Sequence, residues 1–238
     1  MTALAALRLN PELDREALAE AFRRTGRIRI QRLMSEGAPE LYHYLEGADH
    51  WIQVLNKSKG AHEVPLAQWQ APRSRRRPVI EREIYERARD GFQYSYAALR
   101  VPQKGERSGD EVLEAIANLM KRPDMIAFLE AITGVAAPEF VDGQVTAYGP
   151  GDFLTGHDDD VKGSRRKSAF VFGLTPQWRP EWGGLLLFHE PGQVAISGMV
   201  PQFNTLDLFS VPRFHSVTQV TRAAPRRRYT VTGWLAAG

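Results

Sequence analysis

Residues 148–160 read YGPGDFLTGHDDD, in which a turn of glycine and proline at 149–151 is followed by a stretch with strand character. Alternate residues of a strand share one face. We therefore predict that His157 and Asp159 point the same way, about 6.6 Å apart along the chain, while Asp158 faces away. A histidine and a carboxylate on one face can bind one metal ion. Because this short motif is common, a metal site also needs a third ligand from elsewhere in the fold.

The third ligand is predicted to be His215, in the strand-like segment FHSVTQV at residues 214–220. Two imidazoles and one carboxylate on one face of an octahedral ion leave three positions open, as in Fe(II) oxygenases. Zinc prefers four ligands and suits this arrangement less well. Two open positions can chelate an α-keto acid, and the third can take O₂. Surface or hydrogen-bonded roles are expected for the other histidines: His43, His50, His62 and His189.

Short β segments separated by glycine and proline surround these residues. No helix-length pattern interrupts them, so the spacing favours a sandwich or jelly roll over a βαβ fold. The predicted strands are 143–148, 152–157, 167–174, 184–189, 193–197, 204–210, 215–220 and 228–236.

The chain before residue 140 is mostly helical in its pattern, with one short strand predicted around residues 28–33. Asn10 is the expected N-cap of the first helix, with Pro11 at its first position. Further helices are predicted at 38–45, 78–89, 110–120 and 124–132. We expect an α+β protein with a mainly β core, in which residues 1–140 form a helical lobe that supports a catalytic core at 141–238.

Composition narrows the classes of protein and partner. The chain has 238 residues, 43% of them hydrophobic, which is enough for a buried core. It has no cysteine, so any metal is held by His, Asp or Glu. No apolar run approaches membrane length and no secretory signal is recognised, which predicts a cytoplasmic protein without a membrane partner. A net charge of +3 argues against a nucleic-acid partner, and the basic run at 73–77 is expected to be a solvated loop.

The last predicted strand, RYTVTGWLA at residues 228–236, offers an anion site. Arg228, Thr230, Thr232 and Trp234 would share one face. If that face looks inward, a buried arginine lies beside hydroxyl groups and implies a bound anion, because a buried charge needs a partner. The planar guanidinium suits a carboxylate.

Six sequence blocks follow one another in the last part of the chain: Tyr148 with GDFLTGHDD, then SRRKSAFVFGL, EWGGLLLF, VPQFNTLDLF, FHSVTQV and RRRYTVTGWL. In this order they resemble the prolyl hydroxylase branch of the 2-oxoglutarate- and Fe(II)-dependent oxygenases, with the ribosomal-protein and hypoxia-type enzymes as the nearest likeness. The resemblance covers about the last 40% of the chain, and it implies a double-stranded β-helix, which is a cupin-like jelly roll.

The resemblance also implies roles for individual residues. His157, Asp159 and His215 match the iron ligands, and Arg228 matches the basic residue that pairs with the distal carboxylate of 2-oxoglutarate. Further matches are Thr230 and Tyr148 on the co-substrate side and Arg166 and Trp234 near the substrate. The chain departs from the pattern at Gly173, where many relatives carry a tyrosine that helps hold the same carboxylate, and in a longer spacing between His215 and Arg228.

The implied activity is hydroxylation of a prolyl residue in a protein, such as a ribosomal protein, with Fe(II), 2-oxoglutarate and O₂ and with ascorbate as reductant. The alternatives are hydroxylation of a free amino acid or other small molecule, a cupin-like binding module without activity, and a nucleic-acid demethylase. A demethylase would need a basic groove with stacking aromatic residues beside the metal. The sequence leaves the substrate, the stereochemistry and the oligomeric state open.

Overall fold

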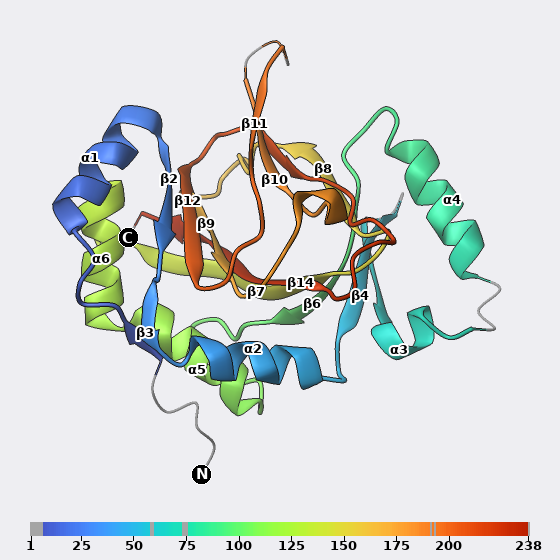
Figure 1. Cartoon of the computed structure of the whole chain (residues 1–238), viewed down its shortest axis with the longest axis horizontal. Helices are drawn as coiled ribbons and strands as arrows, with labels where there is room; N and C mark the ends of the chain where they lie inside the picture. Colours follow the sequence, from blue (N-terminus) through green and yellow to red (C-terminus); the bar gives the residue numbers. More distant parts are fainter. Residues whose placement is uncertain (1–6, 58–59, 73–75, 191, 193, 238) are drawn as a thin grey trace.

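The computed structural model describes residues 7–57, 60–72, 76–190, 192 and 194–237. Within these ranges, twelve strands form one antiparallel sheet that curls round a central space (Figure 1). The main path runs β11-β10-β13-β8-β6-β7-β14-β9-β12-β2, and β4 and β5 branch from β6. This is the predicted α+β jelly-roll core with helices packed on it.

All eight strands predicted for the C-terminal half are present, and the largest shift is at the start of β7, four residues earlier than predicted. Residue 193 of the strand predicted at 193–197 lies outside the described residues. Antiparallel pairing places β14 between β7 and β9, and it places β13 between β8 and β10. The strands are β7 (Glu139–Tyr148), β8 (Phe153–His157), β9 (Arg166–Gly173), β10 (Leu186–His189), β11 (Ile196–Met199), β12 (Thr205–Ser210), β13 (His215–Val217) and β14 (Arg228–Ala236).

The N-terminal part contributes strands to the same sheet, of which only β2 was predicted. β2 pairs with β12, while β6 pairs with β4, β7 and β8. The sheet therefore crosses residue 140, and the division into two domains there stays a prediction. The added strands are β2 (Arg27–Gln31), β4 (Ile52–Lys57), β5 (Gly60–Pro65) and β6 (Tyr94–Arg100), and β1 (Arg8–Leu9) pairs separately with β3 (Met34–Glu36).

Helices cover the outside of the curled sheet: α1 and α6 on one flank, α2 and α5 beneath it, and α3 and α4 on the other flank (Figure 1). None of the helices in the described ranges is long and apolar enough to cross a membrane. The helices are α1 (Arg15–Thr25), α2 (Ala38–Gly47), α3 (Leu66–Trp69), α4 (Arg77–Arg87), α5 (Glu111–Lys121) and α6 (Pro123–Thr133), with a 3-10 turn, η2 (Pro180–Trp182).

The predicted start of the first helix was wrong. Asp14, not Asn10, is the N-cap of α1, and its carboxylate accepts a hydrogen bond from the backbone N–H of Ala17 at 3.0 Å. The Asn10 side chain instead accepts from the N–H of Glu12 and donates to the carbonyl of Arg32. It thus stabilises a turn before the helix. In the basic run at 73–77, residues 73–75 lie outside the described residues.

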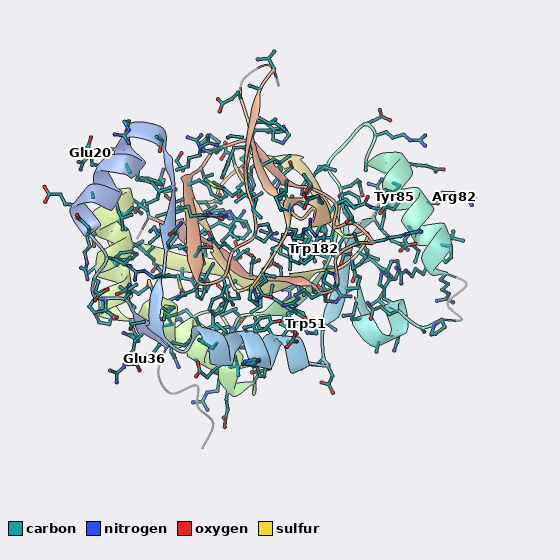
Figure 2. All side chains as sticks on the ribbon, in the orientation of Figure 1. Glu20, Glu36, Trp51, Arg82, Tyr85 and Trp182 are labelled. Atoms are coloured by element: carbon teal, nitrogen blue, oxygen red, sulfur yellow. The ribbon has the colours of Figure 1, made fainter. Side chains whose placement is uncertain are left out.

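A continuous apolar core joins the helices to the outer face of the sheet. Phe128, Leu129 and Ile132 of α6 are almost fully buried in it. Trp51, labelled in Figure 2, packs its ring 5.8 Å from that of Tyr229 on β14. With the outer face covered in this way, the inner face of the sheet is left to line the central space.

Candidate functional site

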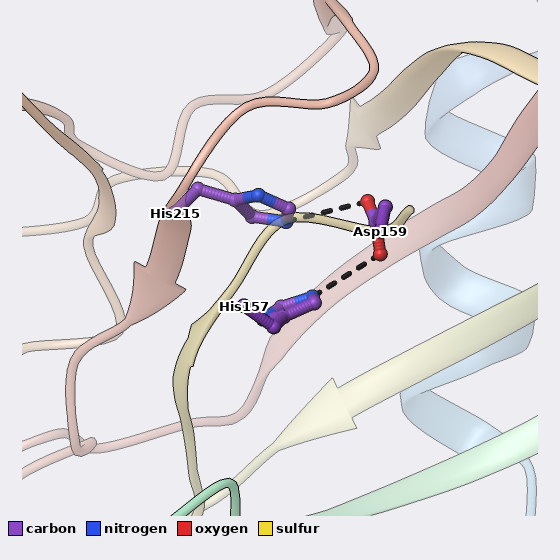
Figure 3. Close-up of side chains that lie close together, drawn as sticks. All are labelled: His157, Asp159 and His215. Carbon is purple, nitrogen blue, oxygen red and sulfur yellow. Dashed lines mark ion pairs between the residues drawn. The ribbon is translucent and has the colours of Figure 1, made fainter. Parts of the chain in front are cut away.

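His157, Asp159 and His215 converge at the inner face, although His215 lies far from the other two in the sequence (Figure 3). His157 ends β8 and His215 begins β13, and these two residues are direct partners across the strand pair. His157 Nε2 lies 3.2 Å from one Asp159 carboxylate oxygen, and His215 Nε2 lies 3.5 Å from the other. One potential ligand atom from each residue lies within 4.8 Å of the others, so the three can share one ion.

The prediction that strand alternation places Asp159 on the same side as His157 was wrong, although the two side chains do meet. β8 ends at His157, so Asp159 does not reach the site by strand alternation. Asp159 has a φ of 63°, in the left-handed region that aspartate tolerates better than most residues. The chain turns sharply after the strand, and this turn brings the carboxylate back beside the imidazole of His157.

Both imidazoles are oriented by backbone carbonyl groups. The Nδ1–H of His157 donates to the carbonyl of Thr155 at 3.1 Å, and that of His215 donates to the carbonyl of Arg213 at 2.7 Å. A proton on Nδ1 leaves the lone pair of Nε2 free, and in both rings Nε2 faces Asp159. Such hydrogen bonds fix the tautomer and orientation that a metal ligand needs.

The electrostatics of the three groups suit a divalent ion. Burial, together with the nearby His157, lowers the pKa of His215 to about 4, so its ring is neutral at pH 7. Burial alone would raise the pKa of Asp159, but the close contacts with His157 and His215 outweigh it, and the pKa lies below its usual value. A metal needs neutral imidazole and ionised carboxylate.

A cavity of about 430 Å³ opens beside these residues, within the size range of small-ligand sites. It is lined by every residue singled out from sequence for the site: the three converging residues with Tyr148, Arg166, Arg228, Thr230 and Trp234. Arg228, Thr230, Thr232 and Trp234 all reach it, as the alternation of β14 predicted.

Arg228 lies deep in this cavity and forms no salt bridge with a described residue. Arg228 is only 3% exposed, and its Nε has no hydrogen-bond partner. The guanidinium lies 5.3 Å from the ring centre of Tyr148. Nearby, the hydroxyls of Thr230 and Thr146 share a hydrogen bond of 2.6 Å. Because an unpaired buried charge is costly, this arrangement calls for an anion.

Arg166 and Trp234 form a second pair on the cavity wall. The guanidinium of Arg166 lies 3.8 Å from the ring centre of Trp234 and pairs with Asp142 at 2.6 Å. Arg166 is therefore already neutralised, in contrast to Arg228.

The departure at Gly173 has a structural explanation. A Cβ at this position would lie 2.4 Å from the backbone carbonyl oxygen of Gln202 and 2.9 Å from the hydroxyl of Thr205. The segment before β12 thus occupies the space that a side chain at 173 would need. A tyrosine there would require that segment to move.

Sequence reasoning missed one wall of the cavity. Phe92, Tyr94 and Tyr96, together with Gln144 of β7, line it. The signal was the alternation of aromatic residues in FQYSY at 92–96, which is typical of a strand with one inward face.

Comparison with known proteins agrees with this geometry. Residues 143–236 match the family model of the 2OG-Fe(II) oxygenase superfamily. The prolyl 3-hydroxylase OGFOD1 of Xenopus laevis is 34% identical over 120 residues, which are 47% of this chain and 23% of that protein. The chain thus spans about a quarter of the length of this curated relative.

Solved structures share the fold over nearly the whole chain. A prolyl-4-hydroxylase of Pseudomonas putida has a TM-score of 0.56 at 15% identity, covering 94% of this chain and 99% of that one. A prolyl hydroxylase of Trichoplax adhaerens, solved with a peptide fragment of the hypoxia inducible factor, has a TM-score of 0.60 at 14% identity, covering 94% and 89%.

The segment that matches the 2OG-Fe(II) oxygenase superfamily, residues 143–236, contains all three converging side chains. The curated relative and the two solved structures described above are all prolyl hydroxylases.

Proposed function

We propose that this protein is a 2-oxoglutarate- and O₂-dependent hydroxylase of a prolyl residue in a protein or peptide. The observation that carries the proposal is the presence, in one cavity, of three convergent side chains that could bind a metal and a buried arginine with no salt bridge to a described residue. A ribosomal protein as substrate, ascorbate as reductant and a cytoplasmic location are parts of the same proposal.

The residues present fit Fe(II). His157 and His215 offer oriented Nε2 lone pairs, and Asp159 offers a carboxylate whose two oxygens face the two rings. This donor set of nitrogen and oxygen suits Fe(II) with open positions. When bound, Fe(II) and 2-oxoglutarate would supply the oxidation of an unactivated C–H bond, with O₂ consumed and succinate and CO₂ released.

The residues also fit 2-oxoglutarate. Arg228 would take the distal carboxylate through its planar guanidinium, and the hydroxyl of Thr230, held by Thr146, would donate to the same group. Burial raises the pKa of Tyr148 well above its usual range, so its phenol stays protonated beside the arginine. The protein's part is to bind, orient and neutralise the co-substrate.

The charges in the cavity favour a peptide over a free amino acid. A free amino acid would bring a carboxylate of its own and need a second cation. The arginines that line the cavity are Arg228, proposed for the co-substrate, and Arg166, already paired with Asp142. The cavity also reaches exposed residues at its rim, Phe92 and Val161, as access for a macromolecule requires.

The test is turnover. Protein with Fe(II), 2-oxoglutarate, ascorbate and O₂ is incubated with short synthetic peptides that carry one central proline and randomised flanks, and separately with free amino acids. We expect succinate together with peptides heavier by one oxygen atom, and no succinate from His215→Ala. Turnover confined to free amino acids would refute the peptide assignment, and no 2-oxoglutarate turnover at all would refute the enzyme.

A further inference from the structure

A row of aromatic rings runs along one wall of the cavity from its rim to its floor. Phe92 lies 5.6 Å from Tyr94, Tyr94 lies 5.5 Å from Tyr96, and Tyr96 stacks on Tyr148 at 5.2 Å between ring centres. The outermost ring, Phe92, also lies 5.2 Å from the imidazole of His157. We call these four residues the aromatic row.

The outer part of the aromatic row is not an ordinary core cluster. Phe92 is 44% exposed and Tyr94 is only partly buried, yet both line the cavity. Tyr94 and Tyr96 alternate along β6, so they share its inward face, and Phe92 lies two residues before the strand. Partly exposed rings on a cavity wall place apolar surface in water, and binding of an apolar group would cover that surface.

The inner and outer rings have different neighbours. Tyr148 lies beneath Arg228, and the hydroxyl of Tyr96 accepts a hydrogen bond from the amide of Gln144 at 3.4 Å, so the inner half belongs with the co-substrate end. Phe92 and Tyr94 are at the opposite end, beside His157 and the exposed rim. The Tyr94 hydroxyl has no hydrogen-bond partner among the described residues, so Tyr94 presents mainly its ring to the cavity.

We propose that Phe92 and Tyr94 form the surface on which the pyrrolidine ring of the substrate's prolyl residue docks, next to the metal ligands. This inference rests on the proposed function and adds a specificity determinant to it. Aromatic-lined grooves bind proline-containing segments well, because the flat ring packs face to face and little chain entropy is lost. Both residues lie outside the segment that matches the superfamily, in the N-terminal part of the chain.

The charges at the rim favour a peptide over a nucleic acid on this surface. Asp158 and Asp160 are exposed and line the cavity mouth. Stacking aromatic residues also bind nucleobases, but a nucleic acid would bring phosphates against these two carboxylates. A peptide carries no such fixed negative charge.

The experiment measures steady-state kinetics with the same pool of peptides that carry one central proline. Tyr94→Leu removes the ring and keeps an apolar side chain, whereas Tyr94→Phe keeps the ring. We expect Tyr94→Leu to raise the apparent KM for the pool about tenfold, and Phe92→Leu several-fold, with kcat and the KM for 2-oxoglutarate changed much less. Tyr94→Phe should restore the wild-type KM. Phe92 is partly exposed, so its replacement does not threaten folding.

The results separate this inference from the proposed function. If the wild type turns over the pool and both leucine variants keep its peptide KM, or lose only kcat, the docking surface is wrong and the enzyme assignment stands. If the wild type turns over no peptide, the proposed function fails. The docking surface is then tested by measuring the binding of a proline derivative.

Binding is measured by saturation-transfer NMR with N-acetyl-L-prolinamide, on protein loaded with Zn(II) and N-oxalylglycine. Transfer to the pyrrolidine protons that is lost in Tyr94→Leu and kept in Tyr94→Phe supports the docking surface. Equal transfer in wild type and Tyr94→Leu overturns it. The docking surface is also wrong if the wild type binds a single-stranded oligonucleotide and Phe92→Leu abolishes that binding.

Discussion

Replacing Arg228 by methionine should weaken 2-oxoglutarate binding strongly without destabilising the protein that lacks ligands. The side chain is 3% exposed and has no carboxylate partner among the described residues. Methionine has similar length and no charge, so Arg228→Met removes the desolvated guanidinium and leaves no large cavity. The variant therefore separates a ligand anchor from a structural arginine.

The magnitude follows from the environment of the guanidinium. Losing one partner of a buried, hydrogen-bonded charge pair costs about 2–5 kcal/mol, which corresponds to a Kd between about 30-fold and several thousand-fold higher. Burial lowers the pKa of Arg228, which reflects the cost of holding its charge out of water. Without ligand, the methionine variant should thus unfold at the same urea concentration as the wild type or at a higher one.

The assay is calorimetric titration of 2-oxoglutarate into protein loaded with Mn(II), together with urea unfolding of the metal-free protein. Arg222→Met, at an exposed position in the loop before β14, is the matched control and should change neither quantity. A Kd for Arg228→Met within threefold of the wild type would refute the anchoring role. A large loss of stability without ligand would show that the arginine is structural instead.

Three further outcomes are expected. His215→Ala should weaken Mn(II) binding at least about 100-fold, measured by the EPR signal of free Mn(II), and wild-type affinity in this variant would exclude His215 as a ligand. Burial holds the pKa of His215 at about 4, whereas the unfolded chain takes up this proton near pH 6.5. The metal-free protein should therefore lose roughly 3 kcal/mol of stability from this group as the pH falls from about 6.5 to about 4. Urea midpoints of wild type and His215→Asn over that range measure it, and parallel curves would contradict it. Gly173→Ala should cost about 1–3 kcal/mol, because the new methyl group meets the carbonyl of Gln202, and an unchanged urea midpoint would show that the segment yields freely.

The C-terminal strands were predictable because their signals are local. Glycine and proline separate short β segments there, and inward residues alternate along β14 from Arg228 to Trp234. The convergence at His157 was predicted as well, but for the wrong local reason, since a left-handed turn at Asp159 replaces strand alternation. A φ of this kind is set by the surrounding fold and leaves little trace in sequence.

The N-terminal strands were not predictable, because their stability depends on distant partners. β4 reads IQVLNK, in which Gln53 takes a buried position that an alternation rule reserves for an apolar residue. Its amide donates at 2.9 Å to the hydroxyl of Ser95 and at 2.8 Å to the carboxylate of Asp152, 99 residues further on. Asp152 also accepts from Ser95 and from the N–H of Gly149. A buried glutamine is stable only with such partners, which the local sequence does not reveal.

This same network explains how an N-terminal strand becomes part of the site. β6 pairs through Tyr94 and Ser95 with β8, and through its later residues with β7, so it joins the two halves of the curled sheet. Pairing with β8 sets Phe92 beside His157, 65 residues away in the chain. The proposed metal and co-substrate residues all lie in the segment that matches the superfamily, whereas the outer half of the aromatic row lies outside it. If Phe92 and Tyr94 form the proposed docking surface, relatives can share the chemistry of residues 143–236 and still differ in substrate through the strand that occupies the place of β6. Residues 92–96 can be exchanged between this protein and a relative that prefers other peptides. The exchange should transfer the peptide preference and leave the requirement for 2-oxoglutarate unchanged.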